Sequence, residues 1–193
     1  MTPAIEGIAV GLGLLYLILA MREKRIAWVA GGAASSIFLL IFWQANLPMQ
    51  ALLQVYYVGI AVFAWRRWGA PESAGALHIT RDSVTDHLRI LALCITAVAG
   101  TLLLRDALSD GQAWLDTSTS WGAVIATWMV AQKRLDAWIY WIIIDAATAA
   151  LYLEAGLIAS GALYILYTAL ALLAWRQWRA NYQRNTSPSA SER

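Results

Sequence analysis

The sequence predicts an all-α integral membrane protein, with seven transmembrane helices arranged as two parallel three-helix repeats joined by a linker helix. Of the 193 residues, 60% are apolar and only 13% are charged, whereas a soluble domain has about half and a quarter. The 11 tryptophans lie mostly near the ends of apolar segments, as is typical of membrane interfaces. This composition excludes a soluble enzyme, a disordered protein and a disulfide scaffold, since Cys94 is the single cysteine.

The apolar segments were divided at charged and turn residues, because a membrane helix needs about 20 mostly apolar residues. Between residues 26 and 65 there is no charge, but Pro48 divides this segment because proline suits a helix start. The predicted spans are about 5–21, 26–43, 48–65, 87–104, 117–131, 135–153 and 157–175. They form one transmembrane domain, 1–184, with repeat one at 5–65, the linker helix at 87–104 and repeat two at 117–175. The Ser-rich tail, 185–193, is predicted to be a disordered cytoplasmic segment.

Basic residues predict the orientation, because short cytoplasmic loops collect Lys and Arg. They follow the first, third, fifth and seventh spans, and Arg105 is the exception on the opposite side. The N-terminus is therefore expected outside the cell and the C-terminus inside. The basic residues in these four segments are Arg22, Lys24, Arg25, Arg66, Arg67, Lys133, Arg134, Arg176, Arg179 and Arg184.

A repeat with an offset of 110 residues relates spans one to three to spans five to seven. The segment Ala-Trp-Arg-Arg-Trp at 64–68 matches Ala-Trp-Arg-Gln-Trp at 174–178, and Ala-Trp recurs at 27–28 and 137–138. Two interfacial aromatic belts could share such a motif without duplication, but several matches at one offset favour a repeat. Both copies have the same orientation, as in parallel-repeat transporter folds, whose sites lie at the seam between repeats.

Asp145 is the strongest functional signal, because it lies near the middle of the sixth span, where an ionised carboxylate costs several kcal/mol. Trp138 and Trp141 share its helix face at spacings of seven and four residues, and Tyr152 extends that face. A carboxylate beside indole rings suits a flat organic cation. The alternative is a protonated aspartate that only holds helices together.

Polar residues in two further spans are candidates for the same site. Gln50 and Gln54 lie one turn apart and Tyr57 follows, and their amides suit a carboxamide or sugar hydroxyls. Tyr164 and Tyr167 in the seventh span could lie opposite. The alternatives are hydrogen bonds between helices for the glutamines and an interfacial belt for the tyrosines.

Several missing motifs argue against other functions. His78 and His87 lie in or beside the long inner loop, so no histidine is expected in the membrane core for haem or for an intramembrane hydrolase. The sequence has no Cys/His cluster with metal spacing, no P-loop and no basic patch for nucleic acid. We therefore expect no catalytic residue, no cofactor and no metal, and hence no enzyme.

Taken together, these motifs resemble the PnuC family of bacterial vitamin transporters, whose typical member takes up nicotinamide riboside. The resemblance covers nearly all seven spans, and its most specific part is the segment from Lys133 to Asp145. The other residues that carry it are Glu6-Gly7, Glu23-Lys24, the segment at 53–57 with Trp65 and Trp68, and Leu151-Tyr152 with Gly156.

The resemblance implies a fold like that of the SWEET sugar transporters, and facilitated diffusion with trapping by a cytosolic kinase. It implies that Trp138, Trp141 and the residue at 145 contact the vitamin, with Gln54 and Tyr57 as candidates. Riboside carriers often have Asn where this chain has Asp145, so nicotinamide riboside is the first expectation and thiamine or another nucleoside-like vitamin the alternative. A non-transporting membrane scaffold is the alternative from a different class.

The expected location is the bacterial inner membrane, as a multi-pass protein in the lipid bilayer with a small vitamin as its substrate. Ion coupling and assembly into a homo-oligomer are left open. The residues predicted to bind substrate are Trp138, Trp141, Asp145, Gln54, Tyr57, Gln50, Tyr152, Tyr164 and Tyr167.

Overall fold

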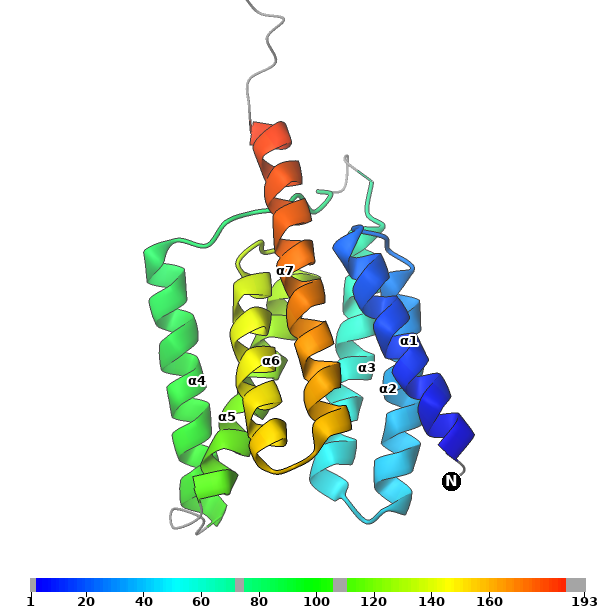
Figure 1. Cartoon of the computed structure of the whole chain (residues 1–193). Coiled ribbons are helices and arrows are strands. Elements are labelled where there is room, and N and C mark those ends of the chain that lie inside the picture. The colour runs from blue at the N-terminus through cyan, green and yellow to red at the C-terminus, as the bar shows by residue number, and fades with distance from the viewer. Residues whose placement is uncertain (1–2, 72–74, 106–110, 187–193) are drawn as a thin grey trace, which may run out of the picture. The chain divides into compact units, whose positions relative to one another are not determined.

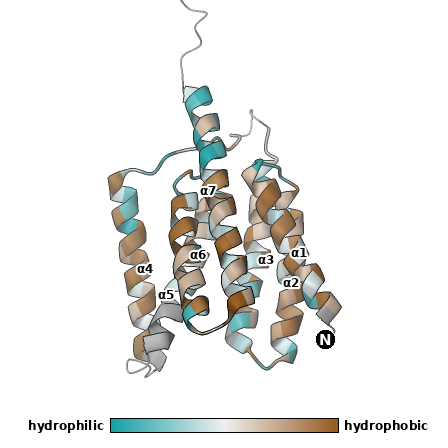
Figure 2. Ribbon diagram, in the orientation of Figure 1, coloured by the Kyte–Doolittle hydropathy of each residue, from teal (hydrophilic) through white to brown (hydrophobic). Residues whose placement is uncertain are grey.

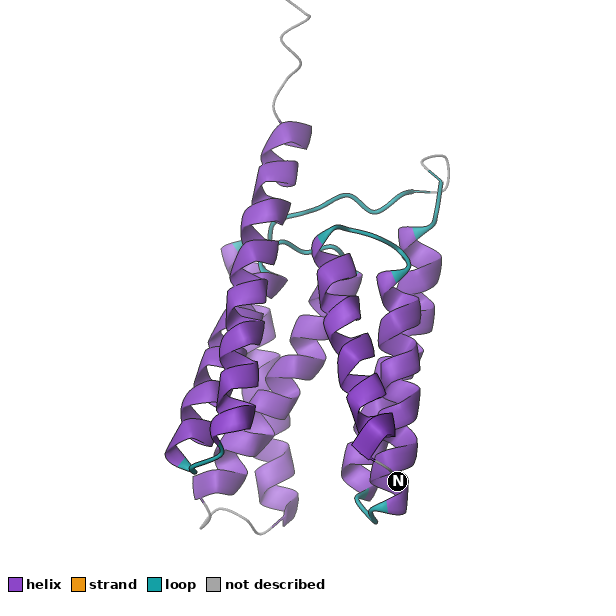
Figure 3. Ribbon diagram, turned by 45° about the vertical axis from the view of Figure 1, so that its right-hand side comes forward, coloured by secondary structure: helices purple, strands orange, loops and turns teal. Residues whose placement is uncertain are grey.

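The computed structural model describes residues 3–71, 75–105 and 111–186, and over these residues it contains seven helices and no strand (Figures 1 and 3). The chain divides into two compact units, Met1–His78 and Ile79–Arg193. The helices are α1 (Pro3–Met21), α2 (Ala27–Gln44), α3 (Pro48–Trp68), α4 (Val84–Arg105), α5 (Gly111–Ala131), α6 (Ala137–Glu154) and α7 (Ile158–Thr186).

Each predicted span corresponds to one of these helices. Among the described residues, α1, α2, α4, α6 and α7 are long and apolar enough to cross a membrane. α3 and α5 are not among these five, and both carry polar side chains, such as Gln50 and Gln54 in α3 and Thr117 in α5. Figure 2 shows apolar residues along the length of the helices and hydrophilic residues at the far end of α7. The chain is therefore an all-helical, multi-pass membrane protein.

Two helices extend well beyond the predicted spans. α5 begins at Gly111 instead of residue 117, and α7 continues beyond residue 175 to Thr186. The predicted spans ended at charged residues, but a charge ends the apolar part of a helix and not the helix itself, because Arg, Gln and Ala favour helix. α7 thus includes Asn185 and Thr186, with which the predicted tail begins, while residues 187–193 lie outside the described residues.

In the first unit, α2 packs against both α1 and α3. Small residues on α2 permit the close approach that membrane helices need. A Cβ added at Gly31 would lie 2.8 Å from the Tyr16 ring of α1, and one at Gly32 would lie 3.3 Å from Ala61 of α3. At the end of this unit, Arg25 donates from Nε to the carbonyl of Trp65 over 2.8 Å and lies over its ring.

In the second unit, α4 packs on α5, α5 on α6, and α6 on α7. Trp121 of α5 donates from Nε1 to the Thr101 hydroxyl of α4 over 3.0 Å. A Cβ at Gly122 of α5 would lie 2.9 Å from Ile144 of α6, and one at Gly161 of α7 would lie 2.5 Å from Leu153 of α6. Glycine at these positions therefore sets how closely α6 approaches its two neighbours.

The ends of the helices recur at the predicted offset of 110 residues. α1 ends at Met21 and α5 at Ala131, α2 and α6 both have 18 residues, and α3 and α7 begin at Pro48 and Ile158. The turn after α1 has Glu23 at φ 54°, and the turn after α5 has Lys133 at φ 56°. We call α1–α3 the first triplet and α5–α7 the second. The left-handed residue that commonly ends a helix thus falls at the same place in both triplets.

The packing inside each triplet also recurs. The rings of Trp28 and Trp68 lie 5.4 Å apart at 84°, and those of Trp138 and Trp178 lie 5.3 Å apart at 83°. The sequence match at residues 64–68 and 174–178 therefore reflects a shared internal packing as well as a shared interface composition.

Candidate functional site

Asp145 lies midway along α6 and is buried, with 5% of its surface exposed. Its helix face, which continues through Ala149 and Tyr152, is the face that approaches α7, where Gly161 lies close to the carbonyl of Ala149. Asp145 is within electrostatic range of the hydroxyl groups of Tyr164 and Tyr167 on α7. A carboxylate thus lies buried midway along a helix that is long and apolar enough to cross a membrane.

The tyrosines beside Asp145 form one aromatic cluster. The rings of Tyr152 and Tyr164 lie 5.3 Å apart, and those of Tyr164 and Tyr167 lie 5.6 Å apart at 86°. The structure therefore brings together four residues that were predicted separately on α6 and α7. A carboxylate and aromatic rings in one place can bind a flat cation through charge and through the ring faces.

Trp138 lies elsewhere on α6. It is 1% exposed and packs edge-on against Trp178, near the end of α7 that carries the arginines. Its Nε1 has no hydrogen-bond partner among the described residues. The seven residues from Trp138 to Asp145 correspond to about 10 Å along a helix axis. Trp141 is half-buried between them, so of the two predicted tryptophans it is the one nearer Asp145 along α6.

The predicted residues of α3 lie in the first unit. Gln54 is buried with 9% exposed, whereas Gln50 and Tyr57 are half-buried. Tyr57 packs its ring 5.4 Å from that of Tyr56, and both lie within electrostatic range of the Tyr16 hydroxyl on α1. Tyr16 was not among the predicted residues, although its polar hydroxyl within the first span was a signal that could have identified it.

The residues on α3 and α7 occupy matching positions in their triplets. Since α3 begins at Pro48 and α7 at Ile158, Gln54 matches Tyr164 and Tyr57 matches Tyr167. The two pairs of candidates, chosen for different reasons, therefore occupy the same turns of the third helix in each triplet. The position that matches Asp145 in the first triplet is Ser35, so the acid is particular to the second triplet.

A groove between α4 and α5 is lined almost entirely by apolar side chains, and it contains no predicted site residue. Its lining suits lipid chains better than a polar vitamin. The lining residues are Cys94, Ile95, Val98, Ala99, Leu102, Leu103 and Ser118.

Membrane-type helices in two matching triplets, with a buried acid among aromatic rings, define the chain as a multi-pass membrane protein with a candidate small-molecule site. A family model described as nicotinamide mononucleotide transporter matches residues 3–180. The chain therefore belongs to that family, and the predicted resemblance to PnuC is confirmed. The family consists of transporters and not of enzymes, so the chain is a vitamin transporter that works in lipid on a small-molecule substrate.

Individual relatives agree with this assignment. The riboflavin/roseoflavin transporter RibM of Streptomyces davaonensis is 25% identical over 92% of this chain and 85% of its own. The nicotinamide riboside transporter PnuC of Escherichia coli is 23% identical over 90% of this chain and 84% of its own. The crystal structure of the vitamin B3 transporter PnuC has the same fold, with a TM-score of 0.72 and 16% identity over 94% of this chain and 83% of its own.

Proposed function

We propose that this protein carries a small cationic vitamin precursor, with nicotinamide riboside as the first choice, across the bacterial inner membrane by facilitated diffusion. The observation that carries the proposal is the burial of Asp145 on α6, within electrostatic range of Tyr164 and Tyr167, which form an aromatic cluster with Tyr152. A buried carboxylate is costly unless a positive charge compensates it. A pyridinium ring supplies that charge and a flat surface for the tyrosines.

The same argument favours a riboside over its phosphorylated form. No Lys or Arg occurs from Ala137 to Trp175, the length of α6 and the apolar part of α7. A phosphate in this site would have no cation to pair with and would lie near Asp145. The neutral ribose, by contrast, needs only hydrogen-bonding groups, which tyrosine hydroxyls and amides supply.

The first triplet contributes to the same function in this proposal. Gln54 and Tyr57 would bind the carboxamide or the sugar, because they occupy on α3 the turns that Tyr164 and Tyr167 occupy on α7. Gln50 would join them from one turn before Gln54. We also propose that α4 is the linker of a 3+1+3 arrangement, with the N-terminus outside and the C-terminus inside. The basic residues at or just after the C-terminal ends of α1, α3 and α5 and in the last part of α7 support this orientation.

Facilitated diffusion alone only brings the vitamin to electrochemical equilibrium across the membrane, which for a cation includes the membrane potential. The sequence contains no P-loop for ATP, and we propose that further accumulation comes from chemical conversion of the vitamin after entry. A cytosolic kinase would supply it, because a phosphorylated product no longer fits the site.

Thiamine is the second candidate, since its thiazolium ring is also a flat cation. Riboflavin is the third, and it is favoured by a different observation, the similarity to RibM. Its ring is neutral and would use the tyrosine cluster without the charge of Asp145. The three vitamins therefore differ in how far their binding depends on that carboxylate.

The test measures binding of nicotinamide riboside, thiamine and riboflavin to the purified protein by calorimetry, and repeats it with Asp145→Asn. A ligand that binds the folded protein also raises its melting temperature. We expect a cationic vitamin to bind, and the substitution to weaken it by about tenfold or more. Binding of riboflavin alone, unchanged by Asp145→Asn, would favour the third candidate, and binding of none would overturn the proposal.

A further inference from the structure

The segment that precedes α4 is attached to the start of α6 by its backbone. Thr80 donates its N–H to the Lys133 carbonyl over 3.1 Å and accepts from the Leu135 N–H over 2.9 Å, in a parallel bridge with Arg134. The Asp82 N–H donates to Oδ2 of Asp136 over 2.8 Å. Residues 80–82, which we call the strap, therefore lie along the turn that joins α5 to α6.

Charged side chains reinforce this attachment. Asp136 is 2% exposed, and it does not cap its own helix through its side chain. Its carboxylate instead accepts the Asp82 N–H of the strap, and Arg81 Nε lies 3.8 Å from Oδ1. Arg134 is paired with Asp82, whose side chain is 3% exposed. A carboxylate at the start of a helix is also stabilised by the helix dipole.

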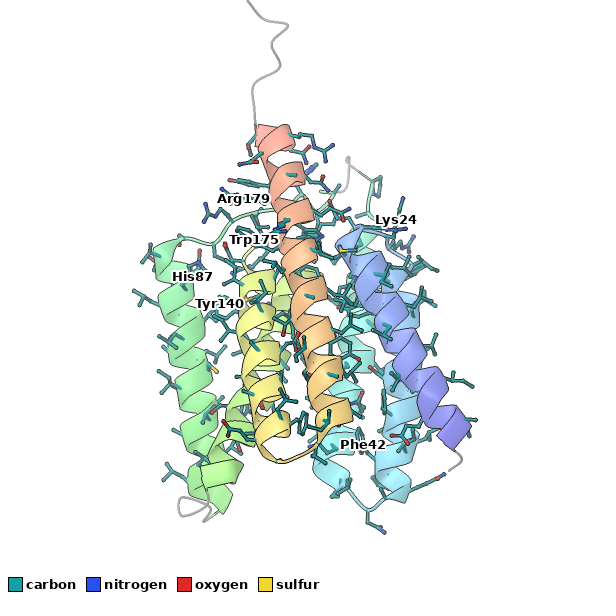
Figure 4. The ribbon with its side chains drawn as sticks, in the orientation of Figure 1. Lys24, Phe42, His87, Tyr140, Trp175 and Arg179 are labelled. Atoms are coloured by element: carbon teal, nitrogen blue, oxygen red, sulfur yellow. The ribbon has the colours of Figure 1, made fainter. Side chains whose placement is uncertain are left out.

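A second contact holds α6 in place one turn further along the helix. His87 Nδ1 lies 2.8 Å from the Tyr140 hydroxyl, and Figure 4 shows the two side chains meeting between α4 and α6. Asp136 and Tyr140 are four residues apart and so share one face of α6. The strap and the start of α4 therefore hold two successive turns of that face.

The face of α6 that carries Asp136 and Tyr140 is opposite to the face that carries Asp145. At 3.6 residues per turn, the nine residues from Asp136 to Asp145 correspond to a rotation of about 180°. Trp141 and Asp145 lie toward the α7 side, while Asp136 and Tyr140 lie toward the strap and α4. A contact on this opposite face restrains rotation of α6 about its own axis, because such a rotation must break the contact.

We propose that Asp136 and Tyr140 are positioning residues, which through the strap and His87 fix the rotation of α6 and so direct Asp145 at Tyr164 and Tyr167. The first triplet lacks this device, because Ile26 stands where the second has Asp136. The inference rests on the proposed function only in taking Asp145 as the substrate-binding acid.

The test compares Asp136→Ala, Tyr140→Phe and the double variant with the unsubstituted protein, using nicotinamide riboside as the ligand. Asp136→Asn is the conservative variant, because its side-chain oxygen can still accept from the Asp82 N–H. Asp86→Ala is the matched control, since Asp86, in the first turn of α4, accepts from Ser83 beside the strap but forms no described contact with α6. We expect the Kd to rise by about tenfold in the double variant. With Asp136→Asn in place of Asp136→Ala, the Kd should return toward that of the unsubstituted protein, and Asp86→Ala should leave it unchanged.

A second readout does not depend on the ligand. Hydrogen exchange of the backbone amides at 137–141 should accelerate in the Asp136→Ala and double variants, but not in Asp86→Ala and not at the matching residues 27–31. Accelerated exchange would support the restraint even if Asp145→Asn left vitamin binding unchanged, which would refute only the proposed site. Wild-type exchange at 137–141 together with wild-type Kd in the double variant would overturn the inference.

Discussion

Trp138 and Trp178 pack edge to face, with ring centroids 5.3 Å apart and both side chains almost fully buried. The pair joins the start of α6 to α7, as Trp28 and Trp68 join α2 to α3 in the first triplet. Buried aromatic pairs of this geometry stabilise by about 0.5–1.5 kcal/mol beyond the area that they bury. The recurrence of the pair in both triplets indicates that it belongs to the scaffold.

Trp178→Ala should therefore lower the free energy of unfolding by about 3 kcal/mol, because it removes a large buried ring and leaves a cavity. Trp175→Ala is the matched control, since Trp175 is only half-buried on the same helix. The measurement is the melting temperature of the two variants in detergent. Equal melting temperatures would show that the pair does not stabilise the fold.

Trp138→Ala and Trp141→Ala should have different consequences. Trp138 is buried in the tryptophan pair, whereas Trp141 is half-buried and closer to Asp145 along α6. We expect Trp138→Ala to lower the melting temperature, and Trp141→Ala to raise the Kd of the vitamin by about tenfold with a smaller effect on melting. The reverse pattern would support the prediction that Trp138 contacts the vitamin.

Gln54→Leu keeps the size of a buried side chain of α3 but removes its amide. If Gln54 binds the carboxamide or the sugar, the Kd should rise by about fivefold to tenfold, the value of one hydrogen bond. Gln44→Leu is the control, because Gln44 is exposed at the end of α2. Identical Kd values for the two variants would remove Gln54 from the site.

The stability of the strap should depend on pH through Asp82. Burial raises the pKa of this carboxyl above its usual value of 3.8, more than the guanidinium of Arg134 lowers it, and Oδ2 of Asp82 is buried without a hydrogen-bond partner among the described residues. The folded protein therefore binds this proton more tightly than the unfolded chain does. The contribution of Asp82 to the free energy of unfolding therefore increases as the pH falls through the raised pKa. It stops increasing once the unfolded chain also takes up the proton.

The melting temperature of the unsubstituted protein should consequently rise, relative to that of Asp82→Asn, as the pH is lowered from neutral to about 4. The comparison between the two proteins removes the contribution of the other titrating groups. A difference that stays constant with pH, or that changes in the opposite direction, would contradict the assignment to Asp82.

Helix positions were predictable because hydropathy is a local property of the chain. The start of α3 at Pro48 and the end of α5 at Ala131 agree with the sequence-based bounds. The 110-residue offset also predicted which residues of the two triplets correspond. α5 begins before its predicted membrane span and α7 continues beyond its own, because charged residues limit a membrane span without ending a helix.

The candidate site was predictable as a set of residues but not as an arrangement. Helical spacing placed Trp138 and Asp145 on one face, yet the two lie against different parts of α7, because that face is longer than one ligand. The strap was not predictable, since the pairing of Thr80 with Arg134 and of Asp82 with Asp136 joins residues more than 50 positions apart.

By itself, the sequence determined that the chain is a membrane protein built from repeated helices. Long segments without charge and motifs at a constant spacing can both be recognised from the order of residues alone. Only the tertiary structure decided which polar side chains meet. Tyr152 of α6 meets Tyr164 of α7 because α7 packs against α6, and helix packing depends on contacts between distant residues that no local pattern records.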